Sequence, residues 1–402
     1  DVRYAARLLR RSPLFALTAM VSLALGIGAN AAIFQLIDSV RLRALPVKNP
    51  GELARVAIDG GNHGMGLNDA YGDLTRPIWE ELRGHPGPFS GLFAWGMTQT
   101  LISDGGRNEQ VSTLLVSGEL FQVLGVQPWQ GRLFLPDDEH ACPATTAVVS
   151  YSYWQTKMGG RRIDADTTLR IDGQPIPVAG VTPPQFFGLV VGAHFDVALP
   201  FCRPKELQRN LFNVTVMGRL RPGVSLAAAS AELSARSAGI MAATEPAGYS
   251  PESVARYRAF RLAAYPAGTG VSRLRKEYDS SLSVLLAITG LVLLIACANL
   301  ANLILARASA RERELGVRLA LGASRGRVFR QLLAENGLLA LIGAAAGIAV
   351  AQVVSRAIVW SLSTESSMVS LPTTVDWRVL AFTAAIGALT CGVFGVIPAL
   401  RA

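Results

Sequence analysis

The densest group of side chains able to do chemistry lies in residues 307–330, between two apolar stretches. This segment contains seven arginines against two glutamates, so its net charge is +5. Leu315 and Leu319 alternate with the charges, and Gly316 and Gly322 interrupt them. The pattern predicts one or two short helices lying on a membrane surface. Two roles stay open for the arginines: binding a partner protein, or binding lipid phosphates and fixing the topology.

A second group consists of polar residues placed close to apolar stretches. Asn299 and Asn302 precede the arginine-rich segment, and Glu335 and Asn336 follow it. An intramembrane polar group is costly unless it is paired, which makes such residues functional hypotheses. Their expected depth near the interface also fits contacts between helices or with lipid headgroups. A role in helix motion is the alternative.

Small residues form a third pattern. Gly343 and Gly347 are four positions apart and present a small face on a helix. Such a face permits close packing, either within one chain or between two copies. Gly26 and Gly28 in the first apolar stretch leave the same choice open.

Signatures of enzymes are missing from the sequence. The four lysines lie outside any GxxxxGK[ST] segment, and there is neither a GxSxG nor an HExxH motif. The four histidines are dispersed without ligand spacing. We therefore expect no catalytic residue, no metal site and no cofactor bound by this chain. Whether Cys142 and Cys202 pair depends on geometry that the spacing does not give.

Composition indicates the elements that must position these groups. Half of the 402 residues are hydrophobic and only 17% are charged. Four stretches are long and apolar enough to cross a bilayer, which takes about 20 residues. The first apolar run is too long for an ordinary signal peptide, so we expect it to be retained. The predicted spans are 14–39, 282–306, 331–360 and 378–398, preceded by a basic amphipathic helix over 1–13.

Charge distribution predicts the topology. The net charge of +9 is concentrated in residues 1–12, in 307–330 and at Arg401, whereas residues 38–281 sum to +1. By the positive-inside rule both termini and 307–330 are cytoplasmic. Residues 40–281 and the short loop 361–377 are then external. Because the basic clusters flank membrane spans, nucleic acid is excluded as a partner.

The external region has the pattern of a folded α+β domain. Asp172-Gly173 and Asp104-Gly105-Gly106 each separate two strand-like runs, which predicts two hairpins. A strand is expected at Asn213–Leu220, followed by a helix that Ser225 caps and that runs to about Met241. Ser117 and Gly125 bracket a short helix.

Six segments make the chain resemble a MacB-type, FtsX-like ABC-transporter permease, in particular the first half of the duplicated permeases of Acidobacteria. The arginine-rich segment ending in RLALGAS is the most specific of them. They are LALGIGANAAIFQLIDSVRLRALP (23–46), GELFQVLGVQPWQGRLFLPDD (118–138), VVSYSYWQTKMGG (148–160), LRIDGQPIPVAGVTPPQFFG (169–188), GRLRPGVS (218–225) and the run at 293–343.

The resemblance implies a fold class and a docking site. The fold is an α-helical membrane protein with four transmembrane helices and a large extracytoplasmic α+β domain between the first two. That domain is implied to consist of a porter-like lobe with a β-rich lobe inserted at about 112–205. In this family the cytoplasmic loop between the second and third spans contacts the ATPase. The matching residues are Arg311, Arg313, Glu314, Leu315, Gly316, Arg318, Leu319, Gly322 and Ala323.

The function implied is that of a permease subunit working by mechanotransmission in the bacterial inner membrane. A separate cytoplasmic ABC ATPase would bind ATP and Mg²⁺ and drive export or extraction of an extracytoplasmic substrate. The alternative is an FtsX-like permease that regulates an extracytoplasmic enzyme. Implied partners are membrane lipids, a second copy or a second permease half, and a periplasmic adaptor or lipoprotein. Because the sequence begins at Asp1 and ends at Ala402, after the fourth apolar stretch, we expect an excerpt of a longer chain.

Overall fold

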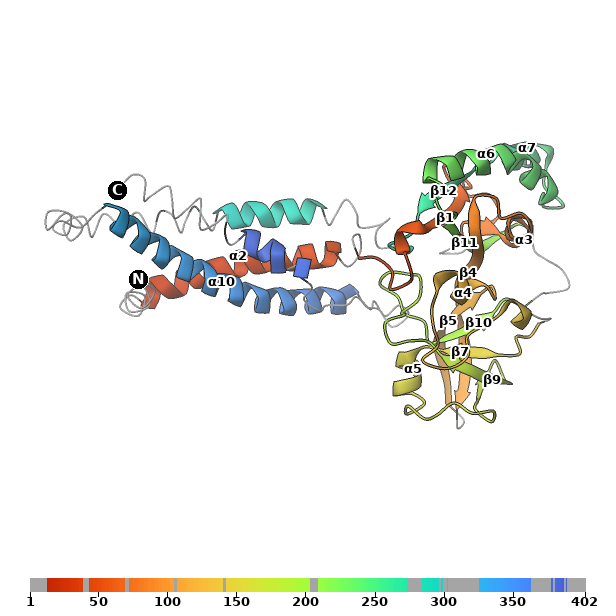
Figure 1. Cartoon of the computed structure of the whole chain (residues 1–402), viewed down its shortest axis with the longest axis horizontal. Coiled ribbons are helices and arrows are strands. Elements are labelled where there is room, and N and C mark those ends of the chain that lie inside the picture. Colours follow the sequence, from red (N-terminus) through yellow and green to blue (C-terminus); the bar gives the residue numbers. More distant parts are fainter. Residues whose placement is uncertain are drawn as a thin grey trace. The chain divides into compact units, whose positions relative to one another are not determined.

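The computed structural model divides the chain into two compact units, which are treated separately below (Figure 1). The first comprises Asp1–Arg43 with Leu274–Ala402, and the second is Ala44–Arg273. The structure describes residues 13–38, 43–68, 72–104, 107–139, 142–202, 209–272, 283–295, 298, 302, 325–362, 377–378, 380–386 and 388. Most of the predicted amphipathic helix over 1–13, of the loop 361–377 and of the span 378–398 therefore lies outside the described residues.

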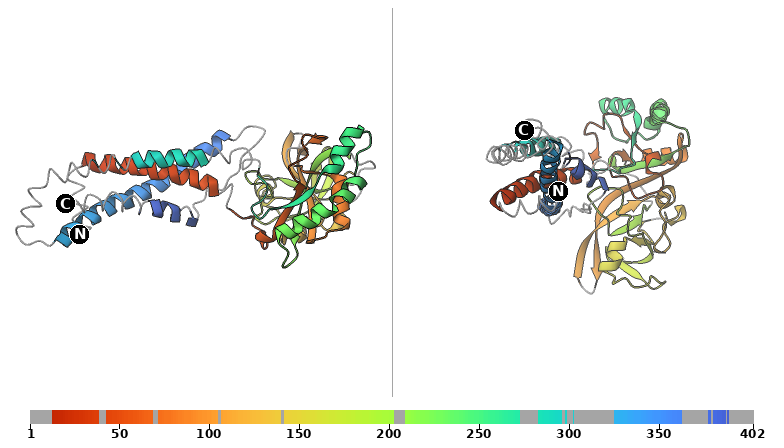
Figure 2. Two further views of the ribbon diagram at one scale, coloured as in Figure 1. Left: turned by 90° about the horizontal axis from the view of Figure 1, so that it is seen from above. Right: turned by 60° about the vertical axis from the view of Figure 1, so that its left-hand side comes forward.

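Helices make up the described part of the first unit. They are α2 (Pro13–Ile37), the helix Ser283–Ile295, α10 (Arg325–Leu362) and a helical stretch over 380–386. Among the residues that the structure describes, two segments are long and apolar enough to cross a membrane, Ala16–Ile37 and Gly337–Ala357. Ser283–Ile295 is apolar but shorter. Figure 2 shows it alongside α2.

A mixed sheet of twelve strands organises the described part of the second unit, in the order β12-β1-β11-β4-β5-β10-β7-β9-β6. β2 and β3 pair with β11, and β8 pairs with both β4 and β9. Most pairs are antiparallel, but three are parallel: β10 with β5, β7 with β9, and β2 with β11. The strands are β1 (Leu53–Ile58), β2 (Leu67–Asn68), β3 (Leu74–Thr75), β4 (Phe89–Asp104), β5 (Arg107–Val116), β6 (Gln130–Gly131), β7 (Ala147–Val149), β8 (Thr168–Ile171), β9 (Gln174–Val181), β10 (Val197–Pro200), β11 (Leu211–Leu220) and β12 (Leu262–Pro266).

Short helices connect and cover these strands. Helices α3, α6 and α7 pack on β1, β11 and β12 around a core that includes Trp79, Leu233 and Tyr257 (Figure 2). Ser250 caps α7 by accepting a hydrogen bond from the backbone N–H of Ser253. The helices are η2 (Pro50–Glu52), α3 (Arg76–Gly84), α4 (Leu120–Leu124), η3 (Pro136–Asp138), α5 (Tyr151–Thr156), α6 (Leu226–Ala243) and α7 (Pro251–Ala259).

Both predicted hairpins are confirmed. β8 and β9 pair antiparallel across Asp172 and Gly173, whose φ angles of 48° and 82° are the left-handed conformations that a tight hairpin turn requires. β4 and β5 pair from Trp95 to Asp104. The predicted strand and its following helix are also present as β11 and α6, and Ser225 accepts a hydrogen bond from the N–H of Ala228.

The start of the short helix near Ser117 differs from the prediction. Helix α4 begins at Leu120 with Glu119 at its N-cap, and Gly125 ends it in the left-handed conformation, as expected. Ser117 instead uses its hydroxyl to accept the N–H of Ala94 on β4. The sequence spacing suited a cap, but a long-range strand contact takes this side chain.

β4 is shared by two parts of the sheet. Its first half, up to Trp95, pairs with β11, and its far end pairs with β8 at Ile102. On the N-terminal side of Thr215, β11 no longer pairs with β4 and pairs with β3. The sheet therefore forks where β11 leaves β4 and β8 pairs with β4 instead. One hydrophobic core lies on β1, β11 and β12, a second around α4 and the middle of β4 and β5, and a third around β7 to β10.

Candidate functional site

The small residues of the first unit line a contact between α2 and α10. A Cβ added to Gly343 would lie 2.7 Å from the Cβ of Leu23, and one added to Gly347 would lie 3.2 Å from the backbone N of Gly28. Gly28 in turn leaves only 2.9 Å between an added Cβ and the carbonyl oxygen of Gly347. Glycine therefore allows the two backbones to approach closely. In this structure the small faces meet within one chain.

Polar side chains near the C-terminal half of α2 contact three different helical segments. The Asn30 amide donates to the carbonyls of Gly26 (2.9 Å) and Thr289 (2.8 Å), and the Thr289 hydroxyl donates back at 3.2 Å. Asn30 is buried and its contacts with Thr289 are partly buried, so this hydrogen-bonded pair ties the two helices together.

Two further polar residues at the C-terminal end of α2 contact other helical segments. The hydroxyl of Ser355 on α10 donates to Gln35 Oε1 at 3.1 Å, and both residues are buried. Asp38, just beyond α2, pairs with Arg378 at 3.3 Å. These α2 residues were not predicted from the sequence, although polar positions inside an apolar run were the available signal.

The residues singled out from the sequence are only partly described. Asn302 is helical and exposed, and Glu335 belongs to α10 with its side chain outside the described part. Asn299 and every residue of the proposed docking set, from Arg311 to Ala323, lie outside the described residues. Their roles remain predictions.

An ionic cluster joins distant segments of the second unit. Arg83 on α3 bonds to Glu139 at 2.9 and 3.1 Å and to Glu119 at 2.8 Å. Glu139, whose side chain is fully buried, also accepts the N–H of Gly118 at 2.8 Å. Burial alone would lower the pKa of Arg83, but the hydrogen bonds and attraction of Glu139, and then of Glu119, raise it. The guanidinium thus stays charged and holds α3 against the segments around α4 and η3.

A disulfide and a cleft lie at the fork of the sheet. Cys142 and Cys202 are bonded, so the question left open by the sequence is answered in this structure. A cleft of about 460 Å³ lies beside them, lined mainly by apolar side chains that include Ile171, Ile176 and Phe201. Arg76 stacks over the Phe201 ring at 4.5 Å and donates to the carbonyl of Cys202. Within the described residues, no group of three His, Cys, Asp or Glu side chains is placed to hold a metal ion.

An apolar helical unit carrying a large inserted α+β domain is the architecture of a membrane permease with an extracytoplasmic domain, and two family matches agree with it. Residues 16–236 match the MacB-like periplasmic core domain, and residues 286–402 match the FtsX-like permease C-terminal domain. The chain therefore belongs to the MacB-like periplasmic core domain family, and its C-terminal part carries an FtsX-like permease domain. Both matched regions are permease domains.

Individual relatives are similar at low identity. The chain is 26% identical over 232 residues to the uncharacterized ABC transporter permease YknZ of Bacillus subtilis, covering 58% of this chain and 53% of YknZ. It is 27% identical over 248 residues to the macrolide export ATP-binding/permease protein MacB of Burkholderia thailandensis, covering 60% of this chain and 35% of MacB. The match thus spans about half of YknZ and about a third of MacB.

A solved structure also matches, a domain of a putative permease protein from Porphyromonas gingivalis. Its TM-score is 0.37 at 17% identity, covering 55% of this chain and 92% of that one.

Proposed function

We propose that this chain is the permease subunit of an ABC transporter that works by mechanotransmission. A separate cytoplasmic ATPase binds ATP and Mg²⁺, contacts residues 311–323, and drives helix movements that reach the second unit. Those movements export or extract a substrate outside the cytoplasm.

The contact between the helices that flank the second unit carries this proposal. Asn30 and Thr289 bond α2 to Ser283–Ile295, the helices that precede and follow the folded domain. Within that domain, the N–H of Leu45 donates to the carbonyl of Gly268 at 2.8 Å, so the segments by which the chain enters and leaves the domain are also joined. A force on either helix is therefore transmitted to both ends of the inserted domain.

The proposed topology has four spans, with both termini and 307–330 cytoplasmic and residues 40–281 external. A membrane-impermeant maleimide applied to intact cells tests it, in a background with Cys297 and Cys391 replaced by serine. Ser90→Cys, at an exposed position of the second unit, should be labelled, whereas Ser309→Cys should be labelled only after permeabilisation. Labelling of Ser309→Cys in intact cells would reverse the proposed orientation.

Partner binding is tested by charge reversal. Glu314→Arg or Arg318→Glu should reduce co-purification with the ATPase while membrane insertion stays unchanged. Lys48→Glu, in the external domain, is the control and should leave co-purification unchanged. Equal recovery of the ATPase with all three variants would refute the docking assignment.

The proposed assembly contains two such four-span units, either two copies of this chain or this part and a second permease half. Lipids surround the spans, and a periplasmic adaptor or a lipoprotein is the proposed external partner. The FtsX-like match over residues 286–402 supports one alternative, regulation of an extracytoplasmic enzyme without transport. Photo-crosslinking from the second unit in cells separates the two: capture of a cell-wall hydrolase favours regulation, and capture of an adaptor or lipoprotein favours transport.

A further inference from the structure

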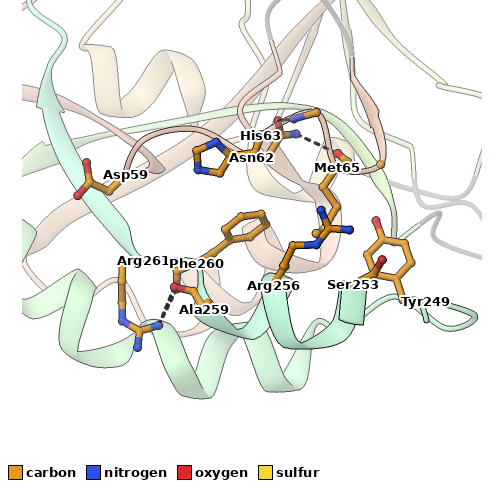
Figure 3. A pocket seen from close by; sticks show the side chains of 12 residues that line it. Asp59, Asn62, His63, Met65, Tyr249, Ser253, Arg256, Ala259, Phe260 and Arg261 are labelled. Atoms are coloured by element: carbon orange, nitrogen blue, oxygen red, sulfur yellow. Dashed lines mark hydrogen bonds between the residues drawn. The ribbon is translucent and has the colours of Figure 1, made fainter. Parts of the chain in front are cut away.

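A cavity of about 590 Å³ lies on the second unit, between α7 and the loop that follows β1. Its volume is within the range of about 300–1,000 Å³ that is typical of small-molecule sites. Figure 3 shows Asn62 and His63 on one side and Phe260 and Arg256 on the other, with Tyr249 at one end. Asp59 lies at the opposite end.

The loop is built to hold its tip over this cavity. Asn62 donates to the carbonyl of Met65 at 3.1 Å and accepts the N–H of Gly64 at 3.2 Å. His63 has a φ of 50°, a left-handed conformation that is uncommon outside glycine and that often marks functional sites. The contacts of Asn62 thus keep the His63 imidazole at the cavity.

Two hydrogen-bond donors at the Tyr249 end have no partner among the described residues. The Tyr249 hydroxyl is buried without a hydrogen bond. Desolvation raises the pKa of this tyrosine, so its hydroxyl keeps its proton at neutral pH and can donate. Arg256 lines the same cavity, and in the described part of the chain its guanidinium makes neither an ion pair nor a hydrogen bond.

The other charged groups of the cavity are already occupied. Asp59 accepts the hydroxyl of Tyr265 at 2.8 Å, and Arg261 donates to carbonyls at the end of α7, including that of Phe260 at 3.0 Å. Asp59 and Arg261 carry opposite charges, so the excess charge of the cavity is the cation of Arg256. Phe260 and Met65 supply apolar surface beside it.

We propose that this cavity binds a small amphiphilic anion, with its carboxylate or phosphate group on Arg256 and Tyr249 and its apolar body against Phe260 and Met65. An arginine beside a second donor suits either anion. The assignment is independent of the proposed transport function, because it rests only on groups within the second unit.

Equilibrium dialysis of the purified full chain in lipid nanodiscs tests this site, with empty nanodiscs to subtract partitioning into lipid. N-acetylphenylalanine and phenyl phosphate are the anionic probes, and N-acetylphenylalaninamide is the uncharged match of the first. At least one anion should bind, and the amide should bind about tenfold or more weakly than its acid. Acetate, which lacks the apolar body, should also bind more weakly.

Variants locate the binding. Arg256→Gln should weaken it about tenfold, and Tyr249→Phe severalfold. Arg258→Gln is the matched control, because it removes the same charge from the same helix outside the cavity, where Arg258 pairs with Glu245 at 2.7 Å. Binding of neither anion, an amide that binds as tightly as an acid that does bind, or unchanged affinity of the bound anion in Arg256→Gln would overturn the proposal.

Discussion

Individual buried charged groups determine how the stability of the second unit depends on pH. Asp196 is an example: its carboxylate accepts the N–H of Ser112 at 3.0 Å but is largely removed from water. Desolvation raises its pKa above the ordinary value of 3.8, and this outweighs the opposing effects of the Ser112 hydrogen bond and of His194.

We predict that wild type loses stability relative to Asp196→Asn as the pH rises. A carboxyl with a raised pKa binds its proton more readily in the folded state, so the stability it contributes at low pH is lost as the pH rises through the raised value. The melting temperature of wild type relative to Asp196→Asn should therefore fall as the pH rises above about 4.

Asp164 provides a control of opposite sign. Its pKa is lowered, chiefly by the hydrogen bond from Thr167, so its contribution is present above the ordinary value and is lost on acidification. The melting temperature of wild type relative to Asp164→Asn should therefore rise as the pH rises. Melting-temperature differences that change in the same direction with pH for both variants would contradict one of the two assignments.

We also predict that removing the Arg83 side chain greatly lowers the free energy of unfolding of the second unit. Arg83→Met leaves the buried Glu139 without its cation, which typically costs about 3–5 kcal/mol. Arg132→Met is the control, because Arg132 forms an equally direct pair with Asp138 but is half exposed, and such pairs contribute about 0–1 kcal/mol. Denaturant unfolding followed by tryptophan fluorescence measures both. Similar losses in the two variants would mean that burial does not distinguish these pairs.

At the scale of elements, the close contact between helices α2 and α10 depends on glycines, which have no side chain, where the two backbones meet. We predict that Gly347→Leu destabilises the purified chain by about 1–3 kcal/mol through overpacking against Ile27 and Gly28. Gly337→Leu on the same helix should be neutral or stabilising, because an added Cβ meets nothing within 4 Å there. Thermal unfolding in detergent measures the stability of both variants. Equal stability of the two variants would mean that the close contact between α2 and α10 is not at Gly347.

At the scale of the whole molecule, the two units have separate cores, so a covalent link within one should not stabilise the other. The Cys142–Cys202 disulfide closes a separation of 60 residues. We predict that Cys142→Ser with Cys202→Ser costs the second unit about 2–4 kcal/mol. Reductant should destabilise wild type equally and leave the double variant unchanged. A matching loss of helix stability in the first unit would show that the units unfold together.

Local patterns were enough to predict several elements of this protein. The Asp-Gly turn fixed the β8–β9 hairpin, because its two residues take left-handed conformations readily, and the Ser225 cap fixed the start of α6. Apolar runs likewise indicated α2 and α10, since the length needed to cross a bilayer is visible in a linear sequence.

Tertiary structure decided what depends on residues far apart in the chain. Arg83 meets Glu119 and Glu139 across 36 and 56 positions, and Asn30 meets Thr289 across 259. The cavity at Arg256 likewise joins a loop after β1 to α7. Hydrophobic periodicity carries no information about such pairings. The sequence by itself therefore determined the kinds of element and the membrane class, whereas folding determined which polar groups meet, because only the packed chain brings them within hydrogen-bond distance.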